Sequence, residues 1–209
     1  MARIHVSTHP LVKHKVTTLR DRTTEPKRFR ELVGEITTLL LWEATTDLPV
    51  REVEVETPIE RTLGSQLGCN VGFVPILRAG LGMTHAALGL MPFAQVWHLG
   101  IYREHDTRTP VEYYNKLPED LDIDVAIVLD PMLATGGSAV AAVDVLKLRD
   151  LRSVKFVGLI AAPEGVEALS AAHPDVSIYL AALDSHLDER AYIVPGLGDA
   201  GDRQFGTAG

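Results

Sequence analysis

Short apolar runs alternate with helical segments from residue 71 onward, and this alternation limits the fold more than any other feature. The apolar runs cover 71–76, 94–102, 124–130, 154–162, 176–183 and 191–194. Residues 78–90 predict a loop of small residues that runs into a helix, and helices are also predicted over 138–150 and 163–172. Strands that alternate with helices form parallel sheets covered on both faces. We therefore predict an α/β fold, a parallel sheet flanked by helices, as one domain over residues 1–209.

The N-terminal part has a different pattern. Residues 29–44 predict an amphipathic helix, with Pro26 suited to its first turn; its apolar positions are Phe29, Leu32, Val33, Ile36, Leu39 and Leu40. We expect this helix to pack against the sheet or at a subunit contact. Residues 50–56 alternate apolar and charged side chains, which predicts a half-exposed strand. Trp42 and Trp97 are expected in the core.

Composition narrows the function classes. The net charge is −8, which argues against a nucleic-acid or anionic-membrane partner. No apolar run is long enough to span a bilayer, and the first residues carry no secretory signal, so a cytoplasmic location is expected. The single cysteine, Cys69, excludes an internal disulfide and is expected to be a small buried residue.

The segment VAIVLDPMLATGGSAVAAVDVL is the most informative one. An apolar strand ends at Asp130, and Thr135-Gly136-Gly137-Ser138 then leads into a helix. Two glycines and a helix N-terminus present backbone N–H groups, which suit a phosphate monoester. An ordinary turn in which Ser138 only caps the helix is the alternative. Asp130 at the carboxyl end of a strand, where open α/β sheets bind ligands, favours the phosphate site.

The stretch VLDPMLATGGS resembles the 5-phosphoribosyl-1-pyrophosphate (PRPP) signature of type I phosphoribosyltransferases. Asp130 is followed by Pro131 in place of a second acid, which resembles the uracil branch of that family. The resemblance implies that Asp130 alone serves the ribose hydroxyls. It implies a PRPP-binding turn made of Asp130, Pro131, Met132, Leu133, Ala134, Thr135, Gly136, Gly137 and Ser138.

Two other segments resemble parts of the same family. VPILRAGLGM (74–83) is similar to its pyrophosphate loop, where Ala79 and Gly80 permit close backbone approach and Arg78 offers a fork for phosphate oxygens. IYREHDTRTPVEYYNKLP (101–118) resembles its mobile hood, taken here as about 103–118. The resemblance places Arg103 on the pyrophosphate as a catalytic residue, whereas a solvated charge run is an equal alternative for Arg108 and Lys116.

The C-terminal stretch 191–206 contains the letters GxGxxG at 196–201. A dinucleotide site would need a following helix and an acid about twenty residues further on, so we reject it. The stretch instead resembles the family's uracil loop. There the backbone of Ile193 and of Gly198, Asp199 and Ala200 would read the base, and Asp199 would lie near the reacting ribose.

Taken together, the resemblance implies transfer of phosphoribose from PRPP to uracil, which forms UMP and pyrophosphate in pyrimidine salvage. It implies Mg²⁺ held mainly by PRPP and water, and a homodimer or homotetramer. It leaves open whether GTP is an effector. A PRPP-sensing regulator of the same fold and an enzyme for another base are the alternatives. The acidic composition argues against the first, and Asp130-Pro131 with the glycine-rich end favours uracil.

Overall fold

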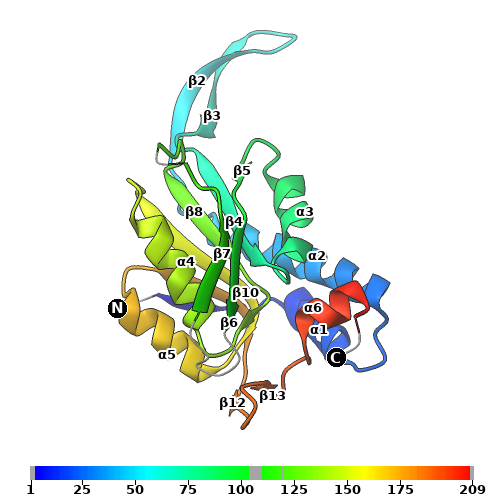
Figure 1. Ribbon diagram of the computed structural model, residues 1–209. Helices are drawn as coiled ribbons and strands as arrows, with labels where there is room; N and C mark the ends of the chain where they lie inside the picture. The colour runs from blue at the N-terminus through cyan, green and yellow to red at the C-terminus, as the bar shows by residue number, and fades with distance from the viewer. Residues whose placement is uncertain (1–2, 104–109, 119, 208–209) are drawn as a thin grey trace.

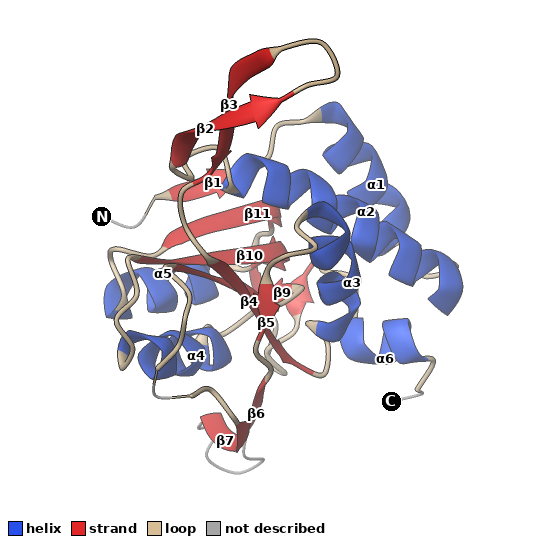
Figure 2. Cartoon of the chain, turned by 90° about the horizontal axis from the view of Figure 1, so that it is seen from above, coloured by secondary structure: helices blue, strands red, loops and turns tan. Residues whose placement is uncertain are grey.

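A central sheet lies between two layers of helices (Figures 1 and 2). The computed structural model describes residues 3–103, 110–118 and 120–207, without the side chains of 102–112. The first half contains β1 (Ile4–Val6), α1 (Pro10–Arg20), α2 (Pro26–Ala44), β2 (Val50–Glu56), β3 (Arg61–Leu67), β4 (Val71–Leu77), α3 (Leu81–Leu90), β5 (Gln95–Val96) and β6 (Leu99–Arg103). The second half contains β7 (Pro110–Asn115), β8 (Val125–Leu129), β9 (Met132–Leu133), α4 (Gly137–Lys147), β10 (Ser153–Ala161), α5 (Pro163–Ala172), β11 (Ser177–Leu183), β12 (His186–Leu187), β13 (Ile193–Val194) and α6 (Ala200–Phe205).

The sheet is mostly parallel, as predicted. Its order is β1-β11-β10-β8-β4-β6-β7, with β5 beside β4 and β9 beside β10. Among the described residues of this central sheet, only β7 runs antiparallel to its neighbour, β6. β7 was not predicted, because as an edge strand it contacts the sheet on one side and shows no apolar run.

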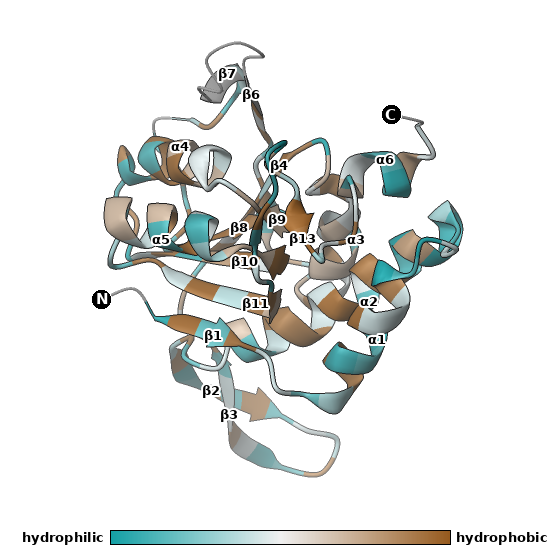
Figure 3. Cartoon of the chain, turned by 90° about the horizontal axis from the view of Figure 1, so that it is seen from below, coloured by the Kyte–Doolittle hydropathy of each residue, from teal (hydrophilic) through white to brown (hydrophobic). Residues whose placement is uncertain are grey.

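Side chains of the central strands point alternately into two cores, because successive residues of a strand face opposite sides. In β8, Val125, Ile127 and Leu129 belong to one apolar cluster, which packs against α1, α2 and α3. Ala126 and Val128 belong to the other, which packs against α4 and α5. The brown helix faces turned to the sheet in Figure 3 show both cores.

The predicted N-terminal helix is α2, with Pro26 in its first turn. It packs on α3, β10 and β11. The prediction for Trp42 was wrong: its side chain is 64% exposed, because it falls on the helix face opposite to buried Leu40 and Leu41. Trp97 does pack against a core cluster. Cys69 is only half-buried, and burial raises the pKa of its thiol.

Strands β2 and β3 form a hairpin arm that leaves the body of the molecule (Figure 1). Residues 50–56 were predicted to be a strand, but its partner β3 was not. The arm is a separate two-stranded sheet, and most of its residues are exposed. It joins the amino end of β4, so it lies at the edge of the sheet opposite to the loops that follow the strands.

Three further elements had no clear sequence signal. α1 buries only Val12, Val16 and Leu19, and β1 has three residues. α6 begins within the segment that resembles the uracil loop. A short helix therefore does accompany the GxGxxG letters, contrary to our expectation. The strand before it, β13, has two residues, pairs antiparallel with β12 and is not part of the βαβ unit that a dinucleotide site needs. Within the described ranges, no helix has the length and apolar character needed to cross a bilayer.

Close contact between the turn after β4 and the end of β8 depends on Gly80, the residue before α3. A Cβ at Gly80 would lie 2.4 Å from the Leu129 carbonyl oxygen and 2.7 Å from that of Ile76, and backbone atoms cannot move aside as side chains do. We predict that Gly80→Ala lowers the free energy of unfolding by about 1–3 kcal/mol. Gly89→Ala in α3 is the matched control, since a Cβ there meets nothing within 4 Å. It should raise stability by about 0.5–1 kcal/mol. Urea denaturation measures both, and equal effects would contradict the steric argument.

Candidate active site

The loops that follow the parallel strands meet at one edge of the sheet and enclose a cavity of about 310 Å³. One wall comes from the turn after β8 and consists of Asp130, Met132 and Ala134. The other wall comes from the C-terminal segment and consists of Arg190, Ala191, Tyr192, Ile193 and Asp199. Two segments that the sequence assigned to PRPP and to uracil thus line the same cavity.

The turn after β8 has the form expected of a phosphate cradle. Asp130 is half-buried, and its carboxylate accepts the N–H of Met132 at 3.3 Å. Gly136 has φ +82°, a conformation that favours glycine, and α4 begins at the next residue. Gly136 is the N-cap, and no side chain of the described residues caps this helix. Ser138 therefore lies inside α4 and is not its N-cap, and the first N–H groups of α4 suit an anion.

The predicted pyrophosphate loop follows β4, the strand next to β8. Pro75 of β4 pairs with Leu129 of β8, so Arg78 and Asp130 both follow the same edge. The Arg78 side chain is 63% exposed, and its guanidinium lies 3.7 Å from an Asp202 carboxylate oxygen. It is not among the residues that line the 310 Å³ cavity. The structure therefore places Arg78 at the edge of the site, as a cation accessible from solvent.

The C-terminal segment turns sharply before it enters α6. Gly196 and Gly198 have φ of +63° and +79°, and the Val194–Pro195 peptide is cis. Asp199 caps α6, because its Oδ1 accepts the N–H of Asp202 at 2.9 Å. Of the predicted uracil-binding residues, Ile193 and Asp199 line the cavity, whereas Gly198 and Ala200 flank Asp199 without lining it.

α6 connects this segment to the pyrophosphate loop. The Gln204 amide donates to the carbonyl oxygens of Ala79 at 3.1 Å and of Ala200 at 3.0 Å. The Arg203 guanidinium donates to the carbonyl oxygen of Leu19 and lies 4.5 Å from the Phe29 ring centroid. The Arg203 guanidinium also donates to the carbonyl oxygen of Asp21, in the connection between α1 and α2, at 2.5 Å. N-terminal helices thus support the C-terminal wall of the site.

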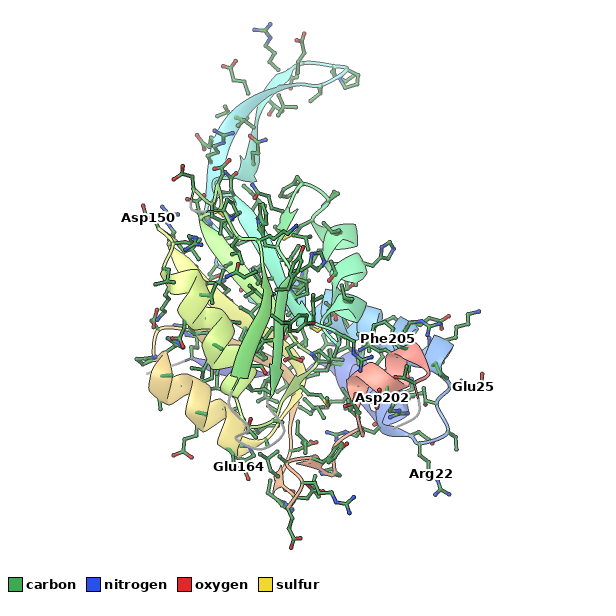
Figure 4. All side chains as sticks on the ribbon, in the orientation of Figure 1. Arg22, Glu25, Asp150, Glu164, Asp202 and Phe205 are labelled. Atoms are coloured by element: carbon green, nitrogen blue, oxygen red, sulfur yellow. The ribbon has the colours of Figure 1, made fainter. Side chains whose placement is uncertain are left out.

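The hairpin of β12 and β13 is attached to α5. Glu164, labelled in Figure 4 at the start of α5, accepts the N–H of Leu187 at 2.9 Å. This hydrogen bond holds the pKa of the Glu164 carboxyl below its usual range. Sequence analysis missed Arg190 and Tyr192 as cavity residues. The position of Tyr192 next to Ile193 was an available signal, whereas Arg190 lies in a polar stretch with no distinguishing pattern.

The predicted hood is only partly described. Arg103 ends β6 and pairs through its backbone with Pro110 of β7. The side chain of Arg103 and all of residues 104–109, including Arg108, lie outside the described residues. Lys116 is exposed, with its amine 5.9 Å from the Tyr114 ring centroid.

Comparison with known proteins agrees with this geometry. Residues 6–207 match the family model described as uracil phosphoribosyltransferase. The chain belongs to the uracil phosphoribosyltransferase family. The uracil phosphoribosyltransferase of Roseiflexus castenholzii is 62% identical over 99% of this chain and 100% of that protein. The one of Listeria welshimeri is 58% identical over the same shares. A structure of the AQ2163 protein from Aquifex aeolicus superposes with a TM-score of 0.90, at 40% identity over 98% of this chain and 99% of that one.

As a uracil phosphoribosyltransferase, the chain forms UMP and pyrophosphate from uracil and PRPP. The enzyme is a glycosyltransferase of pyrimidine salvage. The two alternatives, a PRPP-sensing regulator and an enzyme for another base, are set aside by this result. The predicted fold and activity are thereby confirmed, and the roles of individual residues stay predictions.

The shape of the PRPP turn depends on Gly136. A Cβ there would lie 2.9 Å from the Gly165 carbonyl oxygen, and an L-residue at this positive φ is strained by about 1–2 kcal/mol. If the turn binds the phosphate as predicted, Gly136→Ala should raise the KM for PRPP about tenfold, because the N–H groups of the turn would move away from it. Gly206→Ala is the control: φ is +67°, but its Cβ would meet only Pro26 at 3.8 Å. Steady-state kinetics that show the same KM for PRPP in both variants would contradict this role.

Proposed function

We propose that the 310 Å³ cavity is where phosphoribose and uracil meet. The observation that supports this proposal is that Asp130 and Asp199, from segments with separate predicted roles, line the same cavity. In the proposed complex the turn of residues 134–138 holds the 5′-phosphate with backbone N–H groups and hydroxyls. Asp130 accepts hydrogen bonds from the ribose hydroxyls, unaided by a second acid because Pro131 follows it.

The base is read by the backbone of Ile193 and of residues 198–200. Uracil has one carbonyl oxygen on each side of its N3–H group. A main-chain loop can present the complementary N–H donors and carbonyl acceptor. Cytosine reverses part of this acceptor–donor–acceptor pattern and would leave buried hydrogen-bonding groups of the loop without partners. Such a mismatch can lower kcat/KM by a factor of about 10⁴. Tyr192 and Arg190 complete the wall of the cavity on this side.

The chemical step is a substitution at C1 of the ribose. Uracil N1 forms a bond to C1 as the C1–O bond to pyrophosphate breaks, and the N1 proton passes to the Asp199 carboxylate. Negative charge develops on the departing pyrophosphate, where Arg78 and Arg103 stabilise it. The hood of residues 103–118 excludes water, which would otherwise attack the same carbon. Positioning and electrostatics carry most of the catalysis in this scheme.

Mg²⁺ is the proposed cofactor, held mainly by PRPP and water. The residues fit this role: Asp130 and Asp199 line one cavity, and Mg²⁺ is commonly bound by one or two carboxylates together with substrate phosphates. No group of three or more His, Cys, Asp or Glu side chains suited to a metal gathers among the described residues. When bound, the ion would neutralise charge on the pyrophosphate. A cytoplasmic location stays a prediction of the sequence, which leaves open whether GTP is an effector.

The proposed role of Asp130 can be tested by Asp130→Asn, which keeps the shape of the side chain and removes its charge. We expect kcat/KM for PRPP to fall about a hundredfold, because hydrogen bonds to a charged acceptor contribute about 1.5–3 kcal/mol each. Asp150→Asn is the control, since Asp150 lies at the far end of the sheet (Figure 4). UMP formation is measured with uracil saturating. Equal activity of the two variants would exclude Asp130 from the site.

We also propose that the enzyme is a homodimer or homotetramer in which the hairpin arm contacts a second copy. Two-stranded hairpins are barely stable alone in water. The arm nevertheless exposes Val50, Ile59 and Leu63 to 65%, 90% and 65%. A second copy that covers these side chains would account for an extended arm with apolar residues along its length.

Sedimentation of an arm variant tests this assembly. Ile59→Asp with Leu63→Asp should shift the protein to monomers, because both charges would be buried in the subunit contact. Leu148→Asp is the control, since this leucine is 77% exposed just after α4 and away from the arm. A wild-type monomer, or an arm variant that sediments as the wild type does, would contradict the proposal.

A further inference from the structure

Gly196, in the middle of the C-terminal turn, is held by two charged side chains that do not line the cavity. Its N–H donates to Asp184 Oδ2 at 3.0 Å, and its carbonyl oxygen accepts from Arg20 Nη1 at 2.8 Å. Arg20 is the last residue of α1, and Asp184 follows β11. The N–H and the carbonyl oxygen of Gly196 are therefore each hydrogen-bonded to a charged side chain. We call this pair of side chains, Arg20 and Asp184, the Gly196 clamp.

The two side chains of the clamp also bind each other in a bidentate pair. Arg20 Nη1 donates to Asp184 Oδ2 at 2.7 Å, and Nη2 donates to Oδ1. The Asp184 side chain is only 4% exposed and that of Arg20 is 22% exposed. The Asp184 N–H in turn donates to the Ala161 carbonyl oxygen at 2.8 Å, at the end of β10. The clamp thus connects Gly196 to the central sheet and to α1.

The turn at residues 196–197 is tight and is bound by side chains on more than one side. A Cβ at Gly196 would lie 2.0 Å from the Ile193 carbonyl oxygen, so the chain folds back tightly at this point. Arg203 donates to the next carbonyl oxygen, that of Leu197, at 2.9 Å. Charged side chains therefore bind three backbone groups at residues 196–197, between the cavity residues Ile193 and Asp199.

A site that reads a base with backbone atoms cannot adjust its contacts by changing side chains. Its affinity depends on how rigidly the backbone is held, because hydrogen bonds weaken steeply with small errors of distance and angle. Support of the backbone by neighbouring side chains lowers the cost of ordering the loop when the ligand binds. The residues that hold the loop then determine affinity although they touch no substrate.

We propose that Arg20 and Asp184 are positioning residues that set the affinity for uracil by holding Gly196. This inference rests on the proposed reading of uracil by residues 193–200. The PRPP turn of residues 130–138 has no hydrogen bond to either residue among those found in the described part of the chain. The clamp should therefore affect uracil and leave PRPP binding unchanged.

Arg20→Lys is the most informative variant. It keeps a positive charge beside buried Asp184 but loses the bidentate contact and the hydrogen bond to Gly196. We expect the KM for uracil to rise about tenfold or more, with the KM for PRPP within about twofold of wild type. Arg28→Lys is the matched control: Arg28 pairs with Glu31 and Glu35 on the exposed face of α2, and neither KM should change.

Hydrogen exchange supplies a readout independent of activity. In Asp184→Asn the Gly196 N–H loses a charged acceptor, so its exchange should accelerate about tenfold, while amides of β8 exchange at wild-type rates. Faster exchange at Gly196 with an unchanged KM for uracil in both clamp variants would overturn the proposal, and so would an equal rise in both KM values. Asp184→Asn keeps the inference testable if Arg20→Lys fails to fold, as judged by circular dichroism.

A third variant separates this inference from the proposed uracil site. Gly198→Ala places a side chain at φ +79° directly beside Asp199 and should misdirect the backbone that reads the base. A raised KM for uracil in Gly198→Ala but not in the clamp variants would reject the clamp alone. An unchanged KM for uracil in all three would reject the proposed base site itself.

Discussion

Parallel pairing of β4 with β8 is the constraint on which the site depends. Because the two strands point the same way and are in register, Arg78 and Asp130 leave the sheet at the same edge. Gly80 lets the turn after β4 pass directly over the end of β8, where a side chain would collide with the Leu129 carbonyl oxygen. This register and the close approach at Gly80 make the predicted pyrophosphate loop and PRPP turn neighbours.

An acidic chain that binds a negatively charged substrate needs local attraction. The net charge is −8, and the cavity itself is lined by Asp130 and Asp199. In the proposed complex, oriented N–H groups at the start of α4 provide partial positive charge at the phosphate without any side chain. Such donors are fixed by the helix and need no reorganisation during the reaction, which suits a step that asks for positioning more than for covalent chemistry.

The C-terminal wall is supported from a distance in the sequence. Arg20 reaches Gly196 and Asp184, Arg203 reaches Leu19 and Leu197, and Gln204 reaches Ala79. The bonds of Arg20 to Gly196, of Arg203 to Leu19 and of Gln204 to Ala79 join the end of the chain to α1 and to the predicted pyrophosphate loop. The short helix α6 would be marginal alone, because isolated helices of this length do not persist in water. Its place is therefore a product of tertiary contacts.

The sequence by itself determined the alternation of strands and helices, the turn at 130–138 and the segment at 191–206, since apolar periodicity and glycine-rich turns are local signals. It also carried the family resemblance that the comparisons confirmed. It could not show that Trp42 is exposed, that β3, β7 and α6 form, or that Arg190 lines the cavity. The Gly196 clamp was equally hidden, because Arg20 and Asp184 lie far apart in the chain and neither stands in a distinctive motif. Only the tertiary structure decided these features, since hydrogen bonds and packing between distant segments leave no periodic trace in the sequence.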